Sequence, residues 1–218
     1  MNTKKLSWIL VVAIVVCVLI VFVIFMNNTG RPNSSSLTTQ SESLSIGRFH
    51  PIQGTSIFIA TITNDSERSA NFSARAVRFD YAVPNLVFLD GATLSSHTLF
   101  ETNANVILGL SQFPSPDSDG KVEVKWLVYE VATHDTNSDG AVNSEDHFSV
   151  SVSSVNGLNY AELIVNVERI YGMDLLESQV LLLVYETTDG HLVSKVDLEQ
   201  QIILETQMLT QIPLEEVP

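Results

Sequence analysis

The sequence predicts a mainly β fold, an antiparallel β-meander preceded by one transmembrane helix, and two observations lead to this prediction. After one long apolar run near the N-terminus, short segments with alternating apolar and polar residues recur from Ile46 onward. Turn signals separate these segments, and Asn156-Gly157 and Asp189-Gly190 are typical of short hairpins. We expect the strands to form propeller-like blades or, alternatively, a sandwich.

The apolar run extends from Leu6 to Met26 and contains no charged residue, which is long enough to cross a hydrocarbon core of roughly 30 Å as a helix. Lys4 and Lys5 precede it, and Arg31 is the only basic residue that follows closely. The positive-inside rule therefore places the N-terminus in the cytoplasm and the rest of the chain outside.

This topology divides the chain into four parts. We expect a cytoplasmic N-terminus (1–5), a transmembrane signal anchor (6–26), a flexible linker (27–45) and an extracytoplasmic β-domain (46–218). The linker is rich in Asn, Ser and Thr and holds too few apolar residues to form a core. A cleaved signal peptide is the alternative, but its apolar region is about 7 to 15 residues and ends in small residues, which this run does not.

The charge balance after the apolar run excludes one class of partner. Two of the 11 basic residues precede that run, so the remainder of the chain contains 9 basic and 25 acidic residues. Such a surface repels nucleic acid and anionic headgroups and favours cations. The single cysteine, Cys17, lies in the apolar run, so the domain has no disulfide.

One segment between two predicted strands carries the chemistry of a metal site. Its sequence, DTNSDGAVNSED, matches the spacing of oxygen ligands in an EF-hand calcium loop, with glycine at position six. The closing residue is an aspartate where a typical EF-hand has a glutamate, so we expect weaker Ca²⁺ affinity than in a cytosolic sensor. The predicted ligands are Asp135, Asn137, Asp139, the backbone carbonyl of Ala141, Asn143 and Asp146.

This segment resembles the calcium loop of dockerin modules and related bacterial EF-hand-like proteins. The resemblance covers 12 residues and departs afterwards, because His147 begins an alternating, strand-like segment and no second loop follows. A cohesin-binding role is therefore not implied. The order of strand, aspartate loop and strand also resembles TolB-like propeller blades over about residues 80 to 205. With no disulfide and a dockerin-like loop, we expect the membrane-anchored β-domain to be bacterial.

A short internal repeat accompanies this resemblance. LVYEV at Leu127–Val131 and LVYET at Leu183–Thr187 each follow an apolar segment and lead into a turn that contains aspartate. Repeated antiparallel units of this kind occur in propellers, although two short matches also arise from composition alone.

No nucleophile elbow, phosphate loop, zinc-protease helix or dinucleotide motif is present in the sequence. His134 and His147 flank the loop, but its oxygen ligands suit a hard ion, so we interpret both as loop residues. Trp126, Tyr129 and Phe148 are interpreted as core or cross-strand residues. The function predicted is a noncatalytic calcium-binding module for protein or glycan interaction at the cell envelope. A membrane-tethered glycan hydrolase and a sensory ectodomain acting with a membrane partner stay open, as does the oligomeric state.

Overall fold

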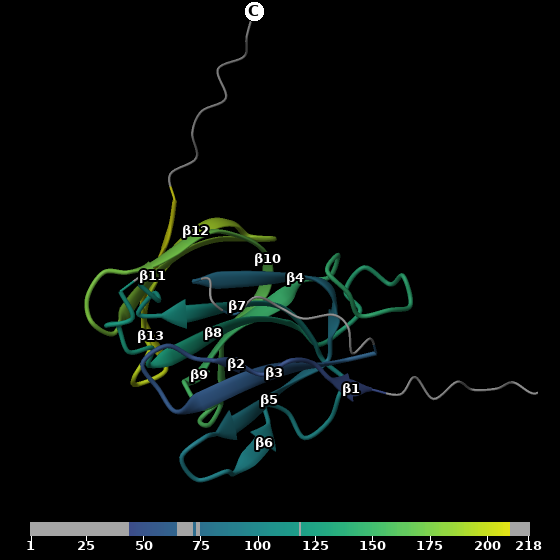
Figure 1. Cartoon of the computed structure of the whole chain (residues 1–218). Coiled ribbons are helices and arrows are strands. Elements are labelled where there is room, and N and C mark those ends of the chain that lie inside the picture. Colours follow the sequence, from purple (N-terminus) through teal and green to yellow (C-terminus); the bar gives the residue numbers. More distant parts are fainter. Residues whose placement is uncertain (1–43, 65–71, 73–74, 118, 210–218) are drawn as a thin grey trace, which may run out of the picture. The chain divides into compact units, whose positions relative to one another are not determined.

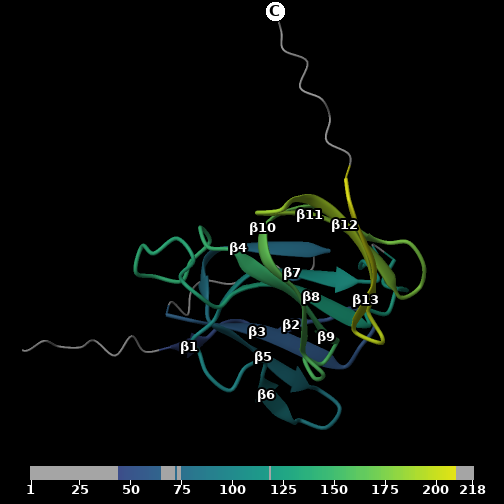
Figure 2. The same cartoon turned by 180° about the vertical axis from the view of Figure 1, so that it is seen from behind.

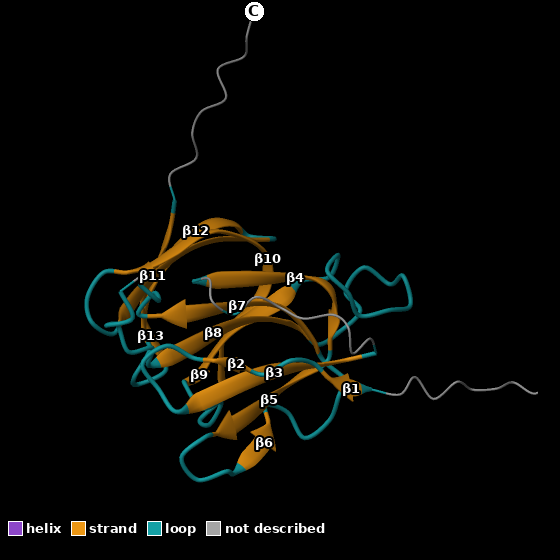
Figure 3. Ribbon diagram, in the orientation of Figure 1, coloured by secondary structure: helices purple, strands orange, loops and turns teal. Residues whose placement is uncertain are grey.

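The computed structural model describes residues 44–64, 72, 75–117 and 119–209, and every regular element in this part is a β-strand (Figure 3). The predicted membrane segment 6–26 lies outside the described residues, as does the linker as far as residue 43. The linker's last residue, Ser45, begins the first strand and pairs with Thr63. Within the described part, no helix is long and apolar enough to span a bilayer.

The smaller of the two sheets has β3 at its centre, paired with β1, β2 and β5, while β6 extends the β5 edge. All of its strand pairs are antiparallel. Its strands are β1 (Ser45–Ile46), β2 (His50–Pro51), β3 (Ile57–Thr63), β5 (Asn85–Asp90) and β6 (Ser96–Thr98).

The larger sheet has eight strands in the order β13-β12-β11-β10-β9-β8-β7-β4, and its pairs are also antiparallel. From β7 onward each strand pairs with the next one in the chain, which confirms the predicted meander. The eight strands form one continuous sheet rather than separate four-stranded blades. They are β4 (Ala76–Val83), β7 (Val106–Phe113), β8 (Trp126–Ala132), β9 (Phe148–Ser154), β10 (Ala161–Leu175), β11 (Val180–Thr187), β12 (Gly190–Asp197) and β13 (Ile202–Met208).

A first hydrophobic core lies between the two sheets, which pack face to face as in a sandwich (Figure 1). The smaller sheet contributes Ile59 and Phe88, and the larger sheet contributes Leu127 and Tyr129 from β8; all four are almost completely buried. Burial of these apolar side chains is the main contribution that holds the sheets together.

A second core forms because the larger sheet curves back over itself, as Figures 1 and 2 show for β10 to β13. Strand β10 has register shifts on both sides, and bulges of this kind bend and twist a strand. The bend brings Leu183 of β11 and Val196 of β12 against Val128 of β8 and Val150 of β9. Both faces of β8 and β9 are consequently covered.

Strand β9 shows how a polar strand face is accommodated between two cores. Val150 and Val152 face the second core, while Ser149, Ser151 and Ser153 on the opposite face are no more than 5% exposed. A buried hydroxyl without a partner is costly, so each serine needs a hydrogen bond. The partners are Glu162, which accepts from Ser149 Oγ at 2.6 Å, Tyr160, whose hydroxyl donates to Ser151 Oγ at 2.8 Å, and Tyr129, whose hydroxyl lies 2.7 Å from Ser153 Oγ.

The LVYE repeat corresponds to two hairpins with the same local geometry. Tyr129 bonds Ser153, which pairs with Leu127 on the neighbouring strand, and Tyr185 bonds Ser194 at 3.0 Å, which likewise pairs with Leu183. The two tyrosines nevertheless belong to different cores. Strands β8 and β11 run in opposite directions in one sheet, so the same hairpin pattern presents its tyrosine to opposite faces.

A buried carboxylate, that of Glu130, forms an ion pair across strand β7 near the β4 edge of the larger sheet. Glu130 of β8 is 8% exposed, and its Oε2 lies 2.9 Å from the Arg78 guanidinium on β4. Strand β7 lies between them and carries Gly109 at this row, where a Cβ would lie only 3.0 Å from Glu130 Oε1. Burial raises the pKa of Glu130, and the charge of Arg78 opposes that rise.

We predict that Arg78→Met destabilises the protein by about 1–2 kcal/mol at pH 7.5, because Glu130 then stays buried without its partner. A carboxyl with a raised folded pKa loses stability as pH increases from its unfolded value, about 4.3, through the folded one. The destabilisation should therefore shrink at pH 4, and adding Glu130→Gln should remove most of it at pH 7.5. Urea unfolding at both pH values measures this. Lys121→Met is the matched control, because the Lys121–Asp119 pair is exposed on both sides and should contribute little.

Candidate calcium loop

The predicted calcium loop connects β8 to β9 and is built from side chains that bond back to the loop's own backbone. Asp135 accepts from the backbone N–H of Asp139 through Oδ1 at 3.2 Å and from that of Gly140 through Oδ2 at 2.8 Å. Gly140 has a φ of +94°, a backbone conformation that glycine adopts without strain. The turn that the template requires at position six is therefore present.

Three of the other predicted ligands converge on Asp139. Its Oδ2 accepts from the side-chain amides of Asn143 at 3.0 Å and Asn137 at 3.4 Å, and its Oδ1 accepts from the Ala141 N–H at 2.9 Å. The Asn143 amide also reaches the Ala141 carbonyl at 3.5 Å. The Ala141 hydrogen bond, followed by the Asn143 one, lowers the pKa of Asp139, which keeps its carboxylate charged.

Asp146, the predicted closing ligand, has a different environment from the other five. It is only 4% exposed, and its Oδ1 accepts from the backbone N–H groups of Thr136 at 2.6 Å and Asn137 at 3.2 Å. Its Oδ2 accepts from the Asn143 N–H at 2.9 Å. These bonds, with the Asn143 one largest, lower the pKa of Asp146. The Asp146 carboxylate therefore links the start of the loop, at Thr136 and Asn137, to its end, at Asn143.

Asn143, Glu145 and Asp146 also form a hydrogen-bonded turn where an EF-hand would begin a helix. Asn143 Oδ1 accepts from the Glu145 N–H at 2.7 Å, while Asp146 accepts from the Asn143 N–H. This exchange resembles the capping box of a helix N-terminus. The chain makes a single turn and enters β9 at Phe148, so a strand follows the loop, as the alternation after His147 predicted.

Thr136 holds the loop together through its side chain, a role that the EF-hand template does not predict. Its hydroxyl donates to Asp146 Oδ1 at 2.9 Å and accepts from the His147 N–H at 2.9 Å, so it links the closing aspartate to the start of β9. Position two of the template supplies no ligand, so the motif itself gives no signal for this residue. A hydroxyl after the first aspartate is the only hint in the sequence.

The loop residues fit a hard cation by the chemistry of their donors. Every predicted ligand offers a carboxylate, amide or backbone oxygen, and calcium takes six to eight oxygen ligands in flexible geometry. In the described part of the chain, no three His, Cys, Asp or Glu side chains gather as a metal-binding group. A cation here would therefore depend on Asn137, Asn143 and the Ala141 carbonyl in addition to Asp135 and Asp139.

The loop also borders a cavity of about 370 Å³ at the end of β8. His134 and His147 both line it; His134 Nδ1 lies within hydrogen-bond distance of Thr133 Oγ1, at 2.7 Å, and His147 Nε2 faces Glu168 Oε1 at 3.6 Å. The structure thus brings the two flanking histidines to one cavity. The other lining residues are Thr133, Thr136, Phe148, Ser149, Glu162, Val165 and Asn166.

We predict that Asp146→Ala lowers the melting temperature by several degrees both with calcium and with EDTA, because backbone N–H groups at both ends of the loop lose their acceptor. The lowered pKa of Asp146 means that its contribution is present above the unfolded pKa, near 3.9, and disappears as pH falls through the folded value. Glu145→Ala, an exposed neighbour, is the control. A melting temperature unchanged in EDTA would show that the aspartate serves the cation alone.

Comparison with known proteins gives a distant likeness among solved structures. No family model matches the chain, and no curated protein matches it. Among solved structures, the β-propeller domain of the Trilobed protease from Pyrococcus furiosus is similar at a TM-score of 0.38 and 14% sequence identity. The match covers 78% of this chain and 43% of that one, so this chain spans less than half of the neighbour's length.

Proposed function

We propose that this chain is a noncatalytic, calcium-stabilised module that residues 6–26 anchor in the cytoplasmic membrane, with its β-domain outside. In that position it presents a surface to a protein or glycan partner at the cell envelope. The observation that carries this proposal is the loop from Asp135 to Asp146, in which side chains at the template spacing gather around Asp139, whose carboxylate accepts from the Asn143 and Asn137 amides. The strongly acidic composition after residue 26 also favours cations as ligands.

The contribution of calcium would be local and structural. Asp135 accepts from the backbone of Asp139 in an exposed loop, and the charge of Asp146 opposes the lowering of the Asp139 pKa, so a divalent cation would offset the repulsion among the carboxylates of the loop. Thr136 and Asp146 connect that loop to the first residues of β9. Both flanking strands are held in the larger sheet, so this site has no helix pair that could open as in a calcium sensor.

We expect calorimetry of the full chain to show one calcium site, and thermal unfolding to show a higher melting temperature in calcium than in EDTA. A free concentration 100 times the Kd adds about 2.7 kcal/mol to the free energy of unfolding. Asp135→Ala and Asp139→Ala should each abolish the heat of binding and the shift.

Asp119→Ala is the matched control for this titration, because Asp119 is an exposed aspartate that also precedes a glycine but lies outside the loop. Its heat of binding should equal that of the wild type. If the wild type gives no heat and EDTA leaves the melting temperature unchanged, calcium binding is excluded. An equal loss in Asp119→Ala would assign the effect to general acidity.

The membrane anchor is tested separately by fractionation. We expect the full chain to stay with the membrane after an alkaline carbonate wash, and a chain lacking residues 1–26 to be soluble. The mass of the full-length protein recovered from membranes should include residues 1–26. A mature N-terminus between residues 26 and 45 would instead identify a cleaved signal peptide.

A further inference from the structure

A second pocket lies where β8 begins, and its central feature is an accessible tryptophan. Trp126 is partly exposed, whereas the six residues that follow it in β8 are buried. With Lys125, Ser178, Gln179 and Glu199 it lines an open pocket of about 270 Å³. An indole is the largest apolar surface that a side chain can offer, and its face suits flat apolar ligand surfaces.

The backbone beneath this tryptophan is fixed on both sides. The N–H of Lys125 donates to the Phe113 carbonyl at 2.8 Å, and its carbonyl accepts from the Val155 N–H at 2.9 Å. Trp126 itself pairs with Phe113 on β7 and Ser154 on β9. A platform on a central strand has little conformational freedom to lose when a ligand binds.

A buried aspartate positions the polar residues of the pocket. Asp197 is 5% exposed, and its carboxylate accepts from Gln179 Nε2 at 3.0 Å and from the backbone N–H groups of Glu199 at 2.9 Å and Gln200 at 2.8 Å. This bond uses one N–H of the Gln179 amide, so the second N–H and the carbonyl oxygen are left to bond a ligand. Asp197 thus holds the Gln179 side chain and the Glu199 backbone, and both residues line the pocket with Trp126.

The charges of the pocket identify the class of ligand. Lys125, whose Nζ lies 5.8 Å from the Trp126 ring centroid, brings one positive charge, and Glu199 brings one negative charge. The pocket therefore offers donors and acceptors with no net charge, on a domain whose surroundings repel anions. A pyranose ring matches this set, since its C–H face is apolar and its hydroxyls both donate and accept.

We infer that the Trp126 pocket binds a pyranose ring of a neutral glycan. The ring stacks on the indole, its hydroxyls donate to Glu199 and Gln179, and the Lys125 ammonium, which lies over the indole ring, donates to the ligand. This inference deepens the proposed interaction role by naming the partner as a glycan. It rests on that role, but the pocket includes no residue of the calcium loop.

The test is a fluorescence titration of the full chain in a detergent without a sugar headgroup, such as lauryldimethylamine oxide. The sequence contains two tryptophans, Trp8 and Trp126, so a Trp8→Phe background makes Trp126 the only reporter. The probes are cellotetraose, tetra-N-acetylchitotetraose and, as an anionic comparison, tetragalacturonate. We expect a saturable change with at least one neutral tetrasaccharide and a Kd at least tenfold weaker for tetragalacturonate.

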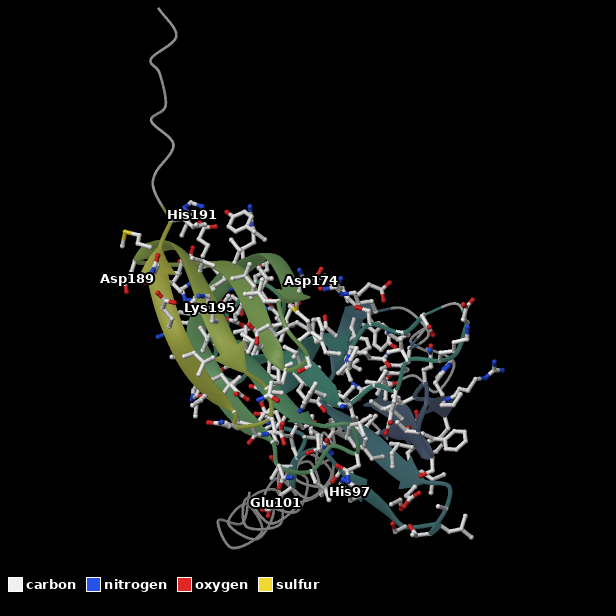
Figure 4. All side chains as sticks on the ribbon, turned by 90° about the vertical axis from the view of Figure 1, so that its left-hand side faces the viewer. His97, Glu101, Asp174, Asp189, His191 and Lys195 are labelled. Atoms are coloured by element: carbon white, nitrogen blue, oxygen red, sulfur yellow. The ribbon has the colours of Figure 1, made fainter. Side chains whose placement is uncertain are left out.

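Variants of the pocket residues localise the effect. Glu199→Gln should weaken binding of the neutral probe at least tenfold, as should Trp126→Phe followed by calorimetry, since phenylalanine preserves much of the packing. Asp189→Asn is the matched control, because it removes a carboxylate at the other end of β12, roughly 26 Å away along eight residues, where Figure 4 labels it. Its Kd should not change.

Three results would overturn the glycan site: no saturable change with either neutral probe, equal affinity for tetragalacturonate, or unchanged affinity in both pocket variants. Repeating the titration in EDTA and in Asp135→Ala separates this inference from the calcium proposal. Sugar binding that is unchanged in EDTA and in Asp135→Ala supports a pocket independent of the metal site, whose own test is the calcium titration. Calcium binding without sugar binding excludes the pocket alone.

Discussion

The rest of the structure depends on three strands, β7, β8 and β9, that are covered on both faces. Their residues are almost all buried, because one face packs on the smaller sheet and the other on the curved half of their own sheet. Every polar group on these strands must then find a partner within the protein. The serines of β9 bond to tyrosines and a glutamate, and Glu130 reaches Arg78 across Gly109.

Much of this fold is readable from the sequence, because alternation and turn chemistry act locally. The meander from β7 to β13 and the hairpin turns follow from these signals, and Tyr129 and Phe148 are buried as interpreted. The curvature of the larger sheet is different. It arises from register shifts within β10, where no glycine or proline marks the first bulges, so its neighbours in space decide its shape.

That curvature also explains why the burial of individual residues differs from what the apolar–polar alternation of the sequence predicts. In LVYEV, the alternation places Glu130 on the face opposite Tyr129, where a simple sandwich would expose it to water. The returning strands enclose that face, so the glutamate is buried and its pKa rises.

Trp126 was interpreted as a core or cross-strand residue, and it packs on the second core while one part stays accessible beside Lys125. For the loop, spacing identified the residues that gather at Asp139, but the burial of Asp146 and the bridging role of Thr136 depend on the three-dimensional path.

Strand β13 differs from β7, β8 and β9 in that it is exposed along its whole length. All seven of its residues are exposed, including Ile202, Leu204 and Met208, and it contributes no residue to either core. Its backbone bonds to β12 hold it, together with the Ser194–Thr206 hydroxyl hydrogen bond at 2.7 Å and the Lys195–Glu205 pair at 3.1 Å. Opening it exposes little apolar surface that is not already in water, so its release costs far less than global unfolding. The domain is therefore expected to open in stages. The backbone amides of β13 exchange with solvent, and its peptide bonds become accessible to proteases, long before those of β8.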